Sequence, residues 1–198
     1  MTIRRRIIAL AAILSFAALA PDAHAAFVLT FTQSGSDVIA TGIGSLDIAD
    51  LAFSTTGPGG AGFNATAGSL GIGPLGTDDV YLGVAGWQTF GIGTHLANAT
   101  GGDIVDIAPR KGQLGVPHNY VSGAALSDTA TWTGATFASL GLIQGTYVAT
   151  WGTGPDADTF TLQIGMPEPM TLGVFVLPAL VFGLVRARRT MLPVPRLA

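Results

Sequence analysis

Apolar and polar positions alternate in short runs through the middle of the chain, and glycine-rich turns separate the runs. The alternation is clearest where Phe160, Leu162 and Ile164 share one face of a segment. Such a period of two predicts strands, whereas no part of this region repeats with the helical period. The pattern predicts eight strands, at residues 26–32, 37–48, 78–86, 103–108, 119–126, 129–137, 146–152 and 158–165.

Eight short strands with turns between them favour an all-β passenger at residues 26–165, an antiparallel β-sandwich of jelly-roll-like type. The glycine spacing leaves a β-solenoid as the alternative. The glycine- and proline-rich segment 55–76 is expected to be irregular. Gly145 followed by Tyr147 at a strand start has the spacing of a tyrosine corner, and the simpler alternative is a core tyrosine.

The first 25 residues have the organisation of a signal peptide. Three consecutive arginines precede an apolar run, and the segment ends in the small-x-small pattern of Ala23 and Ala25. The fourteen apolar residues from Ile7 to Ala20 rise only about 20 Å as a helix, less than a retained membrane anchor needs. We therefore expect cleavage after Ala25.

A second apolar segment lies near the end of the chain. Met170–Val185 has sixteen residues and no charge, which is about 24 Å of helix. Arg186, Arg188 and Arg189 follow it and act as a stop-transfer signal, which places residues 190–198 in the cytoplasm by the positive-inside rule. We expect a transmembrane helix at 170–185 with the passenger outside.

Pro167, Glu168 and Pro169 stand directly before that helix, and the two prolines keep the segment extended. With the apolar helix and the arginines, residues 166–189 resemble the PEP-CTERM protein-sorting domain, which is also called the ice-binding protein C-terminal domain. The resemblance implies bacterial export, retention in the membrane and recognition by an exosortase, in species that make exopolysaccharide or biofilm. The ice-binding name belongs to the signal and gives no ligand for the passenger.

The passenger itself is acidic. Between Ala26 and Met166 the only basic side chains are Arg110 and Lys111, against ten aspartates, so the formal charge of this segment is about −8. Nucleic-acid binding requires clustered lysine and arginine and is therefore excluded. The chain has no cysteine, so disulfides, thiolate metal sites and thiol nucleophiles are excluded as well.

Few motifs indicate chemistry. Gly71–Gly76 matches a dinucleotide fingerprint in letters, but Pro74 interrupts it and a strand is expected to follow, so we interpret it as a turn. His95 and His118 lack the spacing of metal ligands, and no serine has the surroundings of a nucleophile elbow. We expect both histidines at the surface or in loops.

Paired aspartates and tryptophans are the remaining candidates. The aspartates are interpreted as polar strand ends, with acid–base or Ca²⁺ chemistry as the alternative. The pairs are Asp78 and Asp79, Asp103 and Asp106, and Asp156 and Asp158, the last being the calcium candidate because it lies in a Gly-Pro turn. The three tryptophans are Trp87, Trp132 and Trp151. If exposed, they would stack on sugars, whereas tryptophans at alternating strand positions would belong to a core.

The function expected from these features is that of an exported, non-enzymatic bacterial surface or matrix protein. Its partners would be an exosortase-type enzyme, the membrane and exopolysaccharide, with no catalytic residue and no cofactor other than Ca²⁺. A carbohydrate- or calcium-dependent binding module is the alternative. A hydrolase comes third, and it would require facing carboxylates in one cleft.

Overall fold

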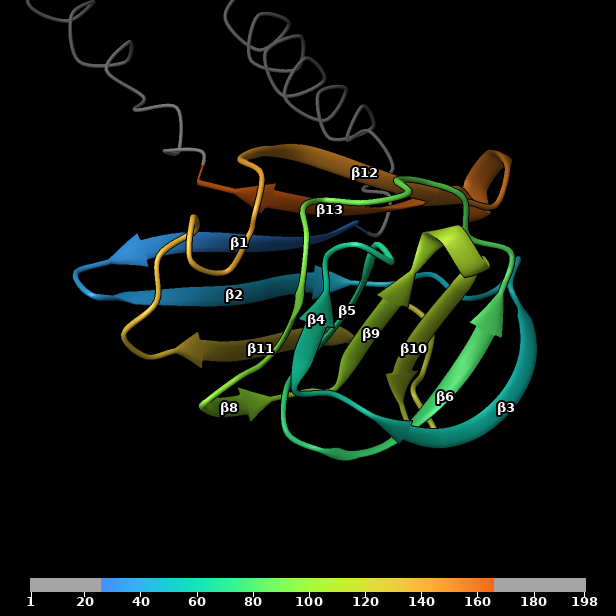
Figure 1. The fold of residues 1–198 in the computed structure, drawn as a ribbon. Coiled ribbons are helices and arrows are strands. Elements are labelled where there is room, and N and C mark those ends of the chain that lie inside the picture. Colours follow the sequence, from blue (N-terminus) through green and yellow to red (C-terminus); the bar gives the residue numbers. More distant parts are fainter. Residues whose placement is uncertain (1–25, 166–198) are drawn as a thin grey trace, which may run out of the picture. The chain divides into compact units, whose positions relative to one another are not determined.

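A computed structural model describes residues 26–165, which form two β-sheets (Figure 1). The predicted signal peptide and the sorting segment with its helix at 170–185 lie outside the described residues. Within residues 26–165, no helix is long and apolar enough to cross a membrane.

The first sheet contains both ends of the described chain. Its six strands, in spatial order, are β12 (Gly145–Trp151), β13 (Asp158–Ile164), β1 (Ala26–Ser34), β2 (Asp37–Ser45), β11 (Ala125–Trp132) and β8 (Ala99–Gly102). β1 and β13 pair in parallel, and the other pairs of this sheet are antiparallel. The expectation of a purely antiparallel passenger is therefore wrong at this one pair.

The second sheet is built from the middle of the chain, and all its pairs are antiparallel. Its seven strands, in spatial order, are β3 (Ala52–Gly59), β6 (Gly76–Leu82), β10 (Gln113–Pro117), β9 (Val105–Ala108), β5 (Ser69–Ile72), β4 (Gly62–Asn64) and β7 (Thr94–Leu96). Two short 3₁₀ turns, η1 (Pro109–Lys111) and η2 (Gly154–Asp156), connect strands.

The all-β prediction is confirmed, but several strand positions are wrong. The segment expected to be irregular, 55–76, contains β4, β5 and the end of β3. Conversely, residues 119–124 form turns and not a strand. Glycine-rich sequence favours a loop by its local preference, whereas in this segment pairing with neighbouring strands keeps it in the sheet.

Aromatic side chains fill the space between the two sheets. Phe31 on β1 stacks on Trp132 of β11 with ring centroids 5.3 Å apart, and Phe63 of β4 lies 5.3 Å from the same tryptophan. Phe63 also contacts Phe90, whose side chain is fully buried. These contacts join a strand of the second sheet to the inner face of the first, so the core lies between the sheets.

All three tryptophans belong to this core. Trp87, Trp132 and Trp151 are 8 %, 2 % and 5 % exposed. The idea of an exposed tryptophan platform for sugars is therefore wrong, and the alternative interpretation as core residues is confirmed. The alternation predicted for Phe160, Leu162 and Ile164 is confirmed too, because all three are buried.

Two tyrosines fasten loops to the sheets through their hydroxyls. The hydroxyl of Tyr147 donates a hydrogen bond of 2.9 Å to the carbonyl of Ile143, four residues upstream, which confirms the tyrosine corner. Tyr120 does more: its oxygen accepts from the Leu46 amide at 3.0 Å and lies 2.6 Å from the Ala124 carbonyl. Each hydroxyl thus satisfies backbone groups of an irregular segment.

The carboxyl group of Asp128 also lies in the core. Asp128 on β11 is 2 % exposed and points into the space between the sheets beside Gly42. Within residues 26–165, neither of its side-chain oxygens meets the geometric criteria of a hydrogen bond. Burial raises the pKa of Asp128 to about 7, although the nearby Gly42 amide works in the opposite direction.

Removing the tyrosine hydroxyls should destabilise the passenger in a graded way. Tyr147→Phe should lower the free energy of unfolding by about 1 kcal/mol, and Tyr120→Phe by more, because its hydroxyl serves several backbone groups. Tyr81→Phe is the matched control, since Tyr81 is half-buried and packs on Phe53 through its ring. Urea unfolding of the three variants tests this order, and equal losses in all three would contradict it.

Asp128 should make the stability depend on pH. Its pKa is higher in the folded state than the unfolded value of about 4, so stability is lost as the pH rises toward 7. Asp128→Asn cannot ionise, so the stability of this variant relative to wild type should increase by about 3 kcal/mol between pH 5 and pH 8. Melting curves of both proteins at the two pH values measure this. If the difference in stability between the two proteins were the same at both pH values, the raised pKa of Asp128 would be disproved.

Candidate functional site: an acidic pocket on a glycine row

The register of the second sheet determines which side chains point away from the core. On β9, Val105 and Ile107 are buried between the sheets, so Asp106 between them faces outward. Paired residues lie on the same face. Asp106 pairs with Gly115 on β10 and with Gly71 on β5, so a glycine flanks the aspartate on either side.

These glycines leave the space that the acidic side chains occupy. A Cβ atom on Gly71 would lie 1.7 Å from an Asp106 carboxyl oxygen, and one on Gly115 would lie 2.2 Å from a carboxyl oxygen of Asp78. Gly59 is equally restricted, because its Cβ would lie 2.1 Å from Asp106. The two carboxyl groups therefore share one hollow with glycine backbone on three sides.

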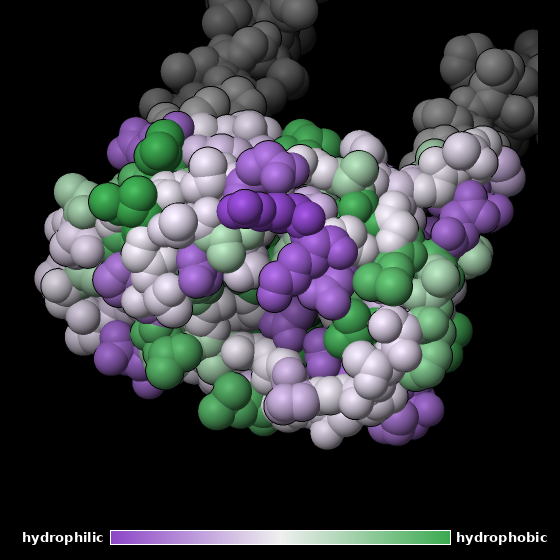
Figure 2. Space-filling view, turned by 45° about the vertical axis from the view of Figure 1, so that its right-hand side comes forward, coloured by the Kyte–Doolittle hydropathy of each residue, from purple (hydrophilic) through white to green (hydrophobic). Residues whose placement is uncertain are grey.

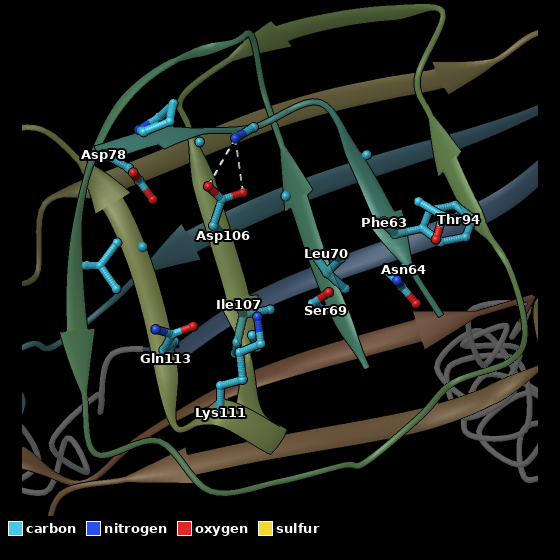
Figure 3. A pocket seen from close by; sticks show the side chains of 18 of the residues that line it. Phe63, Asn64, Ser69, Leu70, Asp78, Thr94, Asp106, Ile107, Lys111 and Gln113 are labelled. Atoms are coloured by element: carbon cyan, nitrogen blue, oxygen red, sulfur yellow. Dashed lines mark hydrogen bonds between the residues drawn. The ribbon is translucent and has the colours of Figure 1, made fainter. Parts of the chain in front are cut away.

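Asp78 and Asp106 form a hydrogen-bonded carboxyl pair. Burial first, and then the hydrogen bond and charge of Asp78, raise the pKa of Asp106 well above its usual range. The pKa of Asp106 is raised to about 7, so this carboxyl ionises at a higher pH than an exposed aspartate does. The Gly60 amide donates to both oxygens of Asp106, at 3.2 and 3.0 Å (Figure 3). Asp78 is 2 % exposed, and its Oδ1 has no hydrogen-bond partner among residues 26–165.

The carboxyl pair lies at one end of an open pocket of about 470 Å³. Uncharged polar side chains form the next row across the sheet: Gln113 pairs with Ala108, Ser69 with Asn64, and Asn64 with Thr94. Lys111, just after β9, is the one basic residue among those lining the pocket. Figure 2 shows hydrophilic side chains gathered along a hollow, with hydrophobic ones at its margins.

A second acidic residue of β6 has a different environment. Asp79 accepts hydrogen bonds from the Thr56 hydroxyl at 2.7 Å and from the Asn119 amide at 2.9 Å, and its other contact is Nδ1 of His118 at 2.9 Å. These partners lower the pKa of Asp79 to about 2. His118 is half exposed, and no hydroxyl group is seen to bond to it within residues 26–165. Within these residues, Asp79 and His118 therefore lack the nucleophile of a catalytic triad.

The other predicted candidates are not brought together. Asp103 accepts from the Ser127 amide, and Asp158 is buried and accepts from the Asp47 amide at 2.6 Å. Asp156 lies in η2, as a half-buried residue. In the described part of the chain, no three histidine, cysteine or acidic side chains group as metal ligands. His95 lies on β7, its ring against Phe63.

The remaining predicted site residues belong to the processing signals. Ala23 and Ala25, the motif Pro167, Glu168 and Pro169, and the arginines after the apolar segment all lie outside the described residues. Their predicted roles stay predictions.

The sequence pairs the acidic residues differently from the structure. Spacing along the sequence groups aspartates that lie close together in the chain. The sheet instead brings together Asp78 from one such pair and Asp106 from another. A signal for this was present, because Gly71 and Gly115 align with Asp106 once the strands are registered. Without that register, the sequence pattern around Gly71 predicts only a turn.

The chain was compared with protein-family models, curated proteins and solved structures, and it matches none of them. The pocket is therefore interpreted from its own geometry.

Gly71→Ala should disrupt the carboxyl pair. The new methyl group would displace the Asp106 carboxyl from the Gly60 amide, so we expect a loss of about 1–3 kcal/mol in the free energy of unfolding. Gly57→Ala is the matched control, since a Cβ atom there meets nothing within 4 Å. Chemical unfolding of both variants tests the prediction. Equal stability of the two would mean that the glycine row does not make room for the acids.

Proposed function

We propose that the chain is an exported, non-enzymatic bacterial surface or extracellular-matrix protein. In this proposal a signal peptide at residues 1–25 directs export, and the PEP-CTERM-like segment at 166–189 anchors the protein until an exosortase processes it. The passenger at 26–165 then acts as a binding module outside the membrane. The observation that carries the binding role is the pocket that holds Asp78 and Asp106.

The architecture of the passenger supports this role. We propose that the two sheets are the layers of a β-sandwich of jelly-roll type, with the aromatic core between them. In such a fold one sheet face can carry a binding site while its other face supports the core. The pocket lies on the outward face of the second sheet, so ligand binding would leave the core unchanged.

The spacing of the carboxyl pair favours binding over glycoside hydrolysis. Glycosidases hold their two carboxyl groups about 5–5.5 Å apart in retaining enzymes and about 6.5–9.5 Å apart in inverting ones. Asp78 lies within side-chain hydrogen-bond reach of Asp106, which is closer than either of these spacings. Facing carboxylates are thus present, but not at the spacing that this chemistry needs.

The sorting role is tested in the native host. Glu168→Ala, or exchange of Arg186, Arg188 and Arg189 for glutamine, should leave export intact while the full-length form accumulates or is misrouted. Arg110→Ala is the control, because this arginine is exposed on the passenger. A pulse-chase of tagged protein with cell fractionation measures both steps. If the signal variants mature and localise like wild type, the tail is a plain anchor.

A further inference from the structure

The pocket contains a polar group that the protein itself leaves without a partner. Asp78 is buried, it faces the pocket, and its Oδ1 accepts no hydrogen bond from the described chain. An unpartnered buried acceptor costs free energy unless a ligand or water donates to it. Asp106, which Figure 3 shows beside it, is half-buried and so is the more exposed member of the pair.

The charge of the pocket is close to balanced. Burial and the neighbouring Asp78 raise the pKa of Asp106 to about 7, which reduces the negative charge of the pocket near neutral pH, and Lys111 supplies one positive charge at the opposite side of the pocket (Figure 3). A pocket of this kind has no excess charge with which to attract a strongly anionic or cationic ligand. Calcium prefers six to eight oxygen ligands, and the pocket offers two carboxyl groups, of which Asp106 has a raised pKa.

The rest of the lining suits a molecule with many hydroxyl groups. Gln113 pairs with Ala108 on β9, and Ser69 pairs with Asn64 further across the sheet; the three polar side chains of Gln113, Ser69 and Asn64 offer both donors and acceptors. Leu96, which is 77 % exposed, supplies apolar surface at the edge of the same pocket. Hydroxyl-rich rings with apolar C–H faces are the ligands that need both kinds of contact.

We infer that this pocket binds a neutral saccharide unit, with Asp78 and Asp106 on two of its hydroxyl groups and the Gln113–Ser69 row on the others. The inference rests on the proposed role of the passenger as a binding module, and it names the ligand class of that site. A volume of about 470 Å³ lies within the usual range for small-ligand pockets.

Calorimetry of the full-length protein in mild detergent tests the inference. The probes are neutral gluco-, manno- and galacto-oligosaccharides, alginate as a polyanion, and Ca²⁺ alone, each with and without EDTA. We expect at least one neutral oligosaccharide to bind in the presence of EDTA. Gln113→Ala and Asp106→Asn should each weaken binding at least tenfold, and the matched variant Gln88→Ala, at an exposed position away from the pocket, should not.

Two results would overturn it. One is a folded protein that binds none of the neutral oligosaccharides. The other is Ca²⁺ binding that Asp106→Asn abolishes while no saccharide binds, which would make the pocket a cation site. Gln113→Ala removes no hydrogen bond seen within residues 26–165, so this variant should fold. It therefore still tests saccharide binding if Asp106→Asn is unstable. Localisation of the Gln113 variant in the host is measured in a separate experiment. A sorting defect and a loss of saccharide binding can therefore be told apart.

Discussion

Packing of Phe31, Trp132 and Phe63 between the two sheets constrains everything built on the outer face of the second sheet. A strand whose inner positions are buried cannot slip by one residue, because the slip would expose its apolar side chains. On β9 this requires Val105 and Ile107 to stay inside, so Asp106 has to face outward. The aromatic core thus determines where the acidic pocket lies.

Glycine allows the pocket to form once that register is set. Glycine weakens a strand because it packs no side chain and loses more backbone entropy on folding. At Gly59, Gly71 and Gly115, however, the missing side chain leaves space for two carboxyl groups. A larger residue at any of these positions would occupy that space. The carboxyl pair and the glycines therefore depend on each other, and the hollow beside them is what remains for a ligand.

The sequence predicts the strands at either end of the passenger well, because their alternation is regular. β1, β12 and β13 lie where the period of two places them, and the tyrosine corner at Tyr147 follows from local spacing. β4, β5 and β10 were not predicted. They are short and rich in glycine, so their strand structure depends on long-range pairing and not on local preference. The pairing of Asp78 with Asp106 depends on the same register, which adjacent spacing in the sequence does not contain.

Carbon-13 NMR of the aspartate carboxyl groups measures the state of the carboxyl pair most directly, with Asp106→Asn used for assignment. If burial and the neighbouring Asp78 act on Asp106 in the glycine-walled hollow, the Asp106 carboxyl should retain its proton until the pH approaches about 7. Asp79, whose ionised form accepts hydrogen bonds from the Thr56 hydroxyl and the Asn119 amide, should remain a carboxylate throughout and serve as the internal reference. An Asp106 carboxyl that is fully ionised by pH 5 would contradict the buried carboxyl pair on which the account of the pocket rests.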